Sequence, residues 1–107
     1  MNLLAVDTST TSCSVALFGG GRLMAERTVT DGKTHSIHLL PLIHDLFERS
    51  RWSLSDLNAI AVTRGPGTFT GLRIGISTVK GLAAAVRIPV VGIGSLAALA
   101  FPPLGQG

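Results

Sequence analysis

The polar turn after the first apolar run is the first place in the sequence where chemistry could occur. Asp7 stands at the end of that run, and hydroxyl residues fill the next five positions. A carboxylate there could hold Mg²⁺, and hydroxyl and backbone N–H groups could hold a phosphate. The same residue types also form Asx and ST turns, in which side chains bond their own backbone. Both interpretations stay open, and the candidate phosphate-binding residues are Asp7, Thr8, Ser9 and Thr10.

A glycine-rich segment, RGPGTFTGLR over residues 64–73, is the second candidate. Gly65 and Gly67 allow backbone N–H groups to face an anion, and a helix is expected to follow. No Gly-Lys-Ser/Thr follows, so this is not the Walker pattern. A strand-to-helix loop that needs glycine geometry explains the segment without a ligand, and for the segment taken alone we favour that explanation.

Three histidines and one cysteine make neither a metal site nor a nucleophilic site. His35 and His38 lie three positions apart on an expected helix, but a structural zinc ion needs four ligands, and no companion residue completes the set. We expect His44 at the surface. Cys13 alternates with apolar neighbours, which is typical of a small core residue. We therefore predict no metal ligand and no catalytic residue.

The elements that must position these candidates follow from the apolar spacing. Apolar runs bounded by turn residues predict strands over residues 2–8, 12–18, 22–30, 59–63 and 90–93. Helical spacing predicts helices over 35–51, 72–86 and 95–101, and Pro41 should kink the first or mark its first turn. The order βββαβαβα predicts an α/β fold, a mixed five-stranded sheet with helices on its faces.

Small residues recur along the second expected helix, on two neighbouring faces: Gly71, Gly75 and Thr78 on one, and Ser77, Gly81 and Ala84 on the other. Each interior glycine costs up to about 1 kcal/mol relative to alanine, so another backbone is expected to approach closely. That neighbour is either the sheet or another chain. Low overall charge favours another chain slightly.

Composition narrows the class of protein. The 107 residues suit one domain, and 46% hydrophobic with 14% charged residues excludes a disordered tail. The net charge of +3 comes from scattered residues, which is weak evidence for a nucleic-acid partner. A single cysteine indicates a reducing compartment. We expect no signal peptide and no membrane span, because glycines and prolines interrupt the uncharged residues 88–107, and hence a cytoplasmic protein.

Three segments together carry a family resemblance: residues 3–17, the glycine-rich residues 64–75, and residues 88–92. Over about residues 2–101 the chain resembles the TsaB (YeaZ) family of bacterial tRNA threonylcarbamoyladenosine synthesis. The resemblance implies an actin/Hsp70-like (ASKHA, ribonuclease H-like) fold. Residues 1–101 would be its N-terminal domain, and 102–107 a loose tail where a second domain would start. Because nucleotide in this fold lies between two domains, any binding by this chain would be weak or vestigial.

The resemblance also separates the chain from the catalytic relative, TsaD. TsaD carries acidic residues in its first turn, where this chain has Thr11 and Ser12. It also carries a histidine pair that would match Ser95 and Leu99. The chain therefore resembles the non-catalytic paralogue, a scaffold or activator without a cofactor of its own. ATP and metal would belong to partner subunits.

The implied partners are TsaD as a heterodimer, TsaE in the complex, a second copy through the same helices when the chain is alone, and tRNA indirectly. The expected partner face comprises Leu40, Ile43, Phe47, Ile74, Thr78 and Gly81. Two alternatives stay open. One is a metal- and ATP-dependent ASKHA transferase or glycoprotease-like hydrolase that uses Asp7. The other is a direct tRNA-binding module that uses Arg64, Arg73 and Arg87.

Overall fold

A computed structural model describes residues 1–8, 13–29, 35–63 and 69–93, and for 35–38 and 69–72 it describes the backbone only. The helix expected over 95–101 and the expected tail lie outside the described residues, as do Thr11, Ser12, Ser95 and Leu99.

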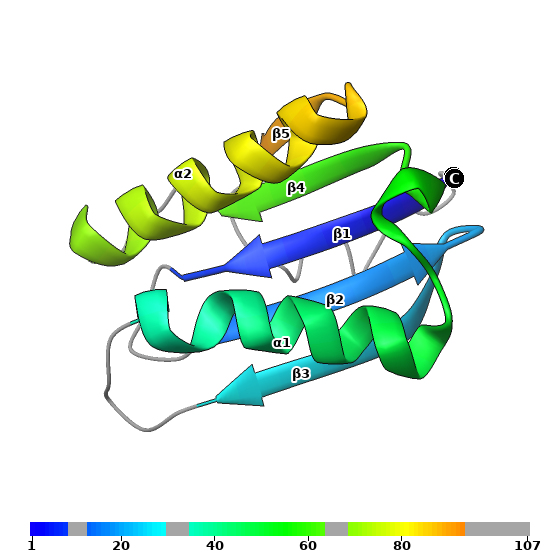
Figure 1. Ribbon diagram of the computed structural model, residues 1–107, viewed down its shortest axis with the longest axis horizontal. Coiled ribbons are helices and arrows are strands. Elements are labelled where there is room, and N and C mark those ends of the chain that lie inside the picture. Colours follow the sequence, from blue (N-terminus) through cyan, green and yellow to red (C-terminus); the bar gives the residue numbers. More distant parts are fainter. Residues whose placement is uncertain (9–12, 30–34, 64–68, 94–107) are drawn as a thin grey trace.

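The five predicted strands form one mixed sheet in the order β3-β2-β1-β4-β5. β1 pairs antiparallel with β2, and β2 with β3, whereas β1, β4 and β5 run parallel (Figure 1). This confirms the predicted mixed five-stranded sheet. The bounds are β1 (Asn2–Asp7), β2 (Cys13–Gly19), β3 (Arg22–Val29), β4 (Ala59–Thr63) and β5 (Val90–Ile93).

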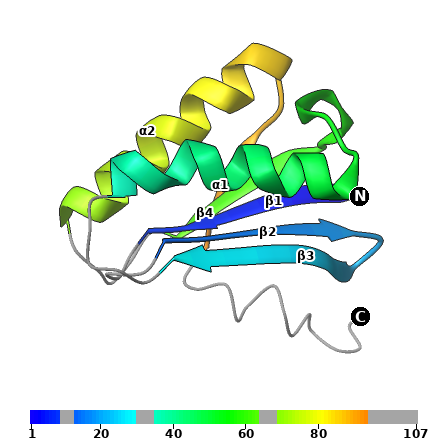
Figure 2. The same ribbon diagram turned by 60° about the horizontal axis from the view of Figure 1, so that its bottom comes forward.

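Two helices, α1 (His35–Ser50) and α2 (Phe69–Val86), lie on the same face of the sheet (Figure 2). α1 covers β2 and β3, and α2 covers β4 and β1. The prediction for α1 needs one correction: the helix begins six residues before Pro41, so Pro41 does not mark its first turn. α2 begins three residues earlier than predicted. A short 3₁₀ helix, η1 (Leu54–Asp56), follows α1, and the Ser53 N–H that precedes it donates to Asp56 Oδ2 at 2.7 Å.

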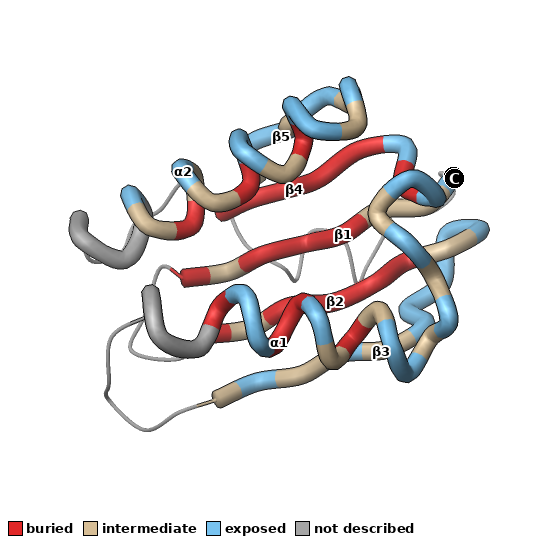
Figure 3. The backbone as a smooth tube through the Cα atoms, in the orientation of Figure 1, coloured by how far each residue is buried: buried red, intermediate tan, exposed pale blue. Residues whose placement is uncertain are grey.

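The main core lies between the sheet and the two helices. Alternate residues of the central strands belong to this core, together with buried residues of both helices. Figure 3 shows the central strands buried along most of their length and both helices alternating between buried and exposed positions. Burying a side chain of this kind contributes roughly 1.5–3 kcal/mol, so this layer carries most of the hydrophobic stabilisation. Its members include Leu4, Val6, Val15, Leu17, Ile60 and Val62 of the sheet, and Leu39, Leu42, Leu46 and Val79 of the helices.

On the opposite face of the sheet, the polarity and size of the side chains differ between three rows that run across the strands. Register places three alanines side by side at its centre, Ala16, Ala5 and Ala61. The row at the carboxyl end of β1 is polar, with Thr28, Ser14 and Asp7 in register. The row at the other end is apolar, with Leu23, Phe18 and Leu3.

Both helices end on an arginine in the left-handed backbone region: φ is 60° at Arg51 and 58° at Arg87. The next residue closes each helix, because the Trp52 N–H donates to the Phe47 carbonyl at 3.2 Å and the Ile88 N–H to the Ala83 carbonyl at 3.1 Å. This is the Schellman ending, which usually has glycine at the left-handed position. A side chain there costs roughly 1–2 kcal/mol.

Candidate functional site

A carboxylate and a hydroxyl meet where the parallel strands β1 and β4 end. Thr63 Oγ1 donates to Asp7 Oδ1 at 2.9 Å. Thr63 is 1% exposed, so the packing around it holds the hydroxyl that donates to Asp7 in place. In open α/β sheets, ligands bind beyond the carboxyl ends of the strands, which makes this the expected place for the predicted phosphate site. Sequence analysis missed Thr63. The signal that could have found it is that Asp7 and Thr63 each end an apolar run, and parallel neighbouring strands bring such ends together.

Thr8 takes a packing role. Its side chain is fully buried, and a Cβ added to Gly75 would collide with Thr8 Oγ1. Gly75 therefore permits close approach of α2 to the end of β1. The prediction of Thr8 as a phosphate contact needs correction, because α2 covers its hydroxyl. Ser9, Thr10, Gly65 and Gly67 lie outside the described residues.

Cys13 is buried in the core, as predicted. Burial, and secondarily the nearby charge of Asp7, raise the pKa of its thiol to about 11. The thiol is thus protonated at neutral pH, which makes it a poor nucleophile and a poor metal ligand. Among the described side chains of residues 1–8, 13–29, 39–63 and 73–93, no three from His, Cys, Asp or Glu are grouped to hold a metal ion. His44 lies 3.4 Å from Glu48 on the exposed side of α1.

The residues predicted for a partner face divide between the core and the surface. Ile43 is only 4% exposed and belongs to the core, so it is removed from the predicted face. Phe47 and Ile74 are half-buried against the same core. Leu40 is 54% exposed, and a Cβ added to Gly81 would meet open space. Thr78 is partly exposed.

One carboxylate links α1 to the neighbouring strand. Asp45 pairs with Arg27 of β3 and accepts from Arg49 Nε at 2.9 Å. These contacts hold the polar side of α1 over β3, while buried leucines hold the opposite side of the helix. Leu40 and Pro41 are therefore directed outward.

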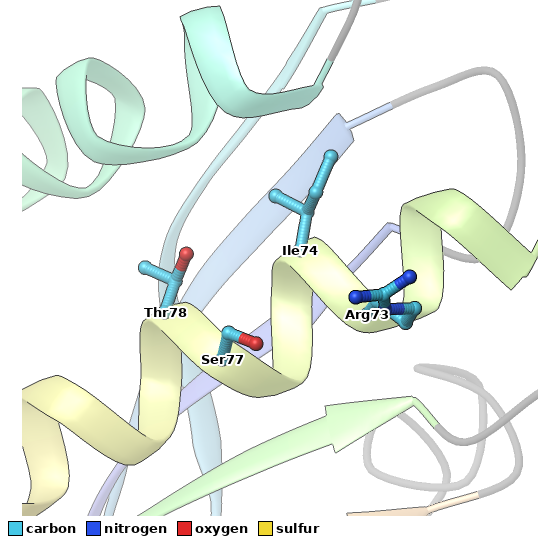
Figure 4. A pocket seen from close by; sticks show the side chains of 4 residues that line it. All are labelled: Arg73, Ile74, Ser77 and Thr78. Atoms are coloured by element: carbon cyan, nitrogen blue, oxygen red, sulfur yellow. The ribbon is translucent and has the colours of Figure 1, made fainter.

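A hollow of about 310 Å³ lies beside the amino-terminal half of α2. Arg73, Ile74, Ser77 and Thr78 line it, and Figure 4 shows Ile74 and Thr78 pointing toward the side on which α1 lies. Two of the predicted partner-face residues thus border one depression with a cationic edge. This depression and the exposed Leu40 make the outer surface of the helices the best candidate for contact with another molecule.

The arginines predicted for direct RNA contact are not brought together. Arg73 lies in the first half of α2 and Arg87 directly follows its last residue, fourteen positions later, so roughly 21 Å of helix separates them. Arg64 lies outside the described residues. Separately, neither described helix is long and apolar enough to cross a membrane.

Comparison with known proteins assigns the chain to a group. Residues 25–106 match the family model TsaD, described as tRNA N6-adenosine threonylcarbamoyltransferase. The Escherichia coli tRNA threonylcarbamoyladenosine biosynthesis protein TsaB is 42% identical over 100 residues, which are 94% of this chain and 43% of that protein. The solved structure of YeaZ from Pseudomonas aeruginosa superposes with a TM-score of 0.84 at 43% identity, covering 97% of this chain and 50% of that one.

A more distant likeness concerns the fold alone. RuvC of Thermus thermophilus superposes with a TM-score of 0.57 at 16% identity. Together with YeaZ, it supports the actin/Hsp70-like, ribonuclease H-like α/β fold. The chain spans about half the length of the TsaB and YeaZ relatives that it matches.

Proposed function

Because the chain belongs to the TsaB (YeaZ) family, within the group that the TsaD model describes, we propose that it acts as a non-catalytic scaffold or activator in tRNA threonylcarbamoyladenosine synthesis. It docks on TsaD through the outer surface of α1 and α2. One observation carries this proposal: Leu40 is 54% exposed on α1 while Gly81 leaves open space on α2.

The proposed contact depends on shape and apolar area. An open glycine lets another helix approach closely, and exposed leucine supplies area to bury, at about 25 cal/mol per Å². The redrawn partner face consists of Leu40, Phe47, Ile74, Thr78 and Gly81. Its polar edge is the hollow at Arg73 and Ser77.

The further partners follow from the same face. A second copy of the chain competes for it when TsaD is absent, and TsaE joins once the heterodimer exists. ATP and metal bind on the partner subunits, and tRNA is reached through the complex. The setting of this chemistry is the cytoplasm.

Binding to the cognate TsaD tests the proposal, with one variant and a matched control. Leu40→Asp places a charge on the proposed face, whereas Met24→Asp places the same charge on β3 at nearly equal exposure, 55% against 54%. In calorimetric titration, Leu40→Asp should weaken binding at least tenfold, about 1.4 kcal/mol. Met24→Asp should bind as the unchanged chain does. Absence of any complex with folded TsaD, or equal effects of both variants, would overturn the proposal.

Nucleotide affinity tests the non-catalytic part. Thr63 already donates to Asp7, and Thr8 is covered by α2, so this chain offers little free polar surface to a phosphate in the described part of the strand ends. Titration with Mg-ATP should show no binding tighter than micromolar. Tight binding, or turnover of ATP by the chain alone, would favour the ASKHA transferase or hydrolase alternative.

A further inference from the structure

Three arginines that are far apart in the sequence lie at one end of the molecule. Arg22 begins β3 after the hairpin turn, Arg51 follows α1, and Arg87 follows α2. The β2–β3 turn and the carboxyl ends of both helices share this end (Figure 1). Hydrogen bonds tie the neighbouring backbone together: the Asn58 N–H donates to the Asn2 carbonyl at 2.8 Å, and the Ile60 N–H to the Pro89 carbonyl at 3.0 Å.

The strand order spreads the arginines across this end. Arg22 stands on β3 at one edge of the sheet, and Arg87 precedes β5 at the other edge. Four strand spacings separate those edges, roughly 19 Å. All three arginines are exposed, and within the described part of the chain none makes an ion pair.

The acidic groups at this end are already engaged. Asp56 accepts hydrogen bonds from the Ser53 N–H and hydroxyl, at 2.7 and 3.2 Å. Glu48 lies 3.4 Å from His44. Asp45 is shared by Arg27 and Arg49, so it offsets the charge of only one of these two arginines. Hydrogen bonds to neutral groups do not cancel the formal charges of Asp56 and Glu48, which line one hollow with Arg51. The three arginines outnumber these two carboxylates, so the net charge at this end is positive.

The backbone supplies an independent observation. Arg51 and Arg87 both occupy the left-handed position where glycine ends a helix without strain. Neither side chain packs in the core, because both residues are exposed. Attraction to the carboxyl end of the helix offsets part of the strain. Arginine therefore occupies two positions where glycine would avoid the strain, which indicates that these side chains serve something other than the stability of the fold.

We propose that Arg22, Arg51 and Arg87 form a contact surface for the phosphate backbone of RNA, separate from the partner face on α1 and α2. Guanidinium groups bind phosphate oxygens in a bidentate manner, and such contacts orient an RNA without reading its sequence. Choosing RNA over another polyanion rests on the proposed role in tRNA modification. On this proposal the chain contacts tRNA directly, through the end of the sheet opposite Asp7, and not only through its partners.

Fluorescence anisotropy with a labelled, unmodified tRNA transcript tests the surface, using the chain alone between 50 and 200 mM KCl. Binding of phosphates releases counterions, so affinity should fall steeply with salt. The double variant Arg51→Gly/Arg87→Gly should lose at least tenfold in affinity at the lowest salt. Its log–log salt slope should become shallower by about one for each arginine removed. Glycine suits both backbone positions, so the variant should keep its thermal midpoint within a few degrees, as Trp52 fluorescence can verify.

Lys80→Gln is the matched control, because it removes an exposed cation from the body of α2, away from this end of the molecule. It should leave the affinity and the slope unchanged. The proposal is overturned if the unchanged chain does not bind at low salt, if the double variant binds equally well, or if only Lys80→Gln loses affinity. Displacement of the RNA by an equal charge concentration of polyglutamate would overturn RNA in favour of an acidic protein partner. None of these outcomes depends on TsaD, so they are distinct from failure of the docking proposal.

Discussion

The inner and outer faces of the helical layer use the same residue types in opposite surroundings. Leu46 is 1% exposed beneath α1, while Leu40 on the same helix is 54% exposed. Gly75 touches Thr8 beneath α2, while Gly81 on the same helix faces open space. The fold of this chain accounts for the inner leucine and the inner glycine. The outer pair has no such explanation within the described residues, which makes the outer face the one that a partner would explain.

The largest expected effect compares the two leucines. Leu46→Ala should lower the free energy of unfolding by about 3 kcal/mol, because it leaves a cavity in the core. Leu40→Ala should change it by less than about 0.5 kcal/mol, because the side chain is already in water. Urea unfolding followed by the fluorescence of Trp52, the one tryptophan of the chain, measures both. Equal losses would contradict the division into two faces.

The second effect concerns Cys13, which lies on the helix-facing side of β2. The pKa of its thiol is about 11 in the folded chain, against an ordinary value of 9.0. The unfolded chain therefore loses this proton first as the pH rises. The stabilisation is complete below pH 9 and is lost between pH 9 and 11, by roughly 2 to 3 kcal/mol. The free energy of unfolding of Cys13→Ala, measured from pH 8 to 11, should fall less steeply than that of the unchanged chain. If the two curves of free energy against pH run parallel, the prediction is wrong.

The third effect concerns the inner glycine. Gly75→Ala should cost about 2 kcal/mol, because the new methyl group meets the hydroxyl of buried Thr8 and the backbones must separate. The cost should shrink when Thr8→Ala is present, since that change removes the colliding atom. A double-mutant cycle measures this coupling. A cost that is unchanged by Thr8→Ala would mean that the contact is not the cause.

The smallest effect concerns the outer glycine. Gly81→Ala should stabilise the chain by up to about 1 kcal/mol, because alanine favours a helix and no atom lies in the way. The same change should weaken association with TsaD if that glycine permits close approach. Thermal unfolding and calorimetric binding separate the two results. Loss of stability in the isolated chain would show that Gly81 is crowded after all.

Much of the fold could be predicted from apolar spacing, because strands with period two and helices with period 3.6 leave clear patterns. The start of α2 was placed three residues late, because Gly71 resembles loop sequence while the helix tolerates it. The partner face could not be fixed: leucine, isoleucine or phenylalanine occupies positions 39, 40, 42, 43, 46 and 47, which together span nearly half the circumference of α1. Only packing shows that Ile43 is inside and Leu40 outside.

The candidate sites were less predictable, because they depend on contacts between distant segments. Asp7 ends β1, as the apolar run before it predicts, but its hydroxyl donor lies 56 positions later in the chain. The basic end could not be read from the sequence either. Arg22, Arg51 and Arg87 fall in three separate elements, and only the crossovers bring them to one end of the sheet.

The row of three alanines across β2, β1 and β4 limits how a layer can pack on the face of the sheet opposite the helices. Layers on a sheet normally stand about 10 Å away, a separation set by side chains of medium size. Methyl groups at Ala16, Ala5 and Ala61 allow a shorter separation along the midline than at the bulkier Leu3 and Phe18. A covering layer would therefore have to tilt, standing nearer at the alanines and farther away toward the large residues.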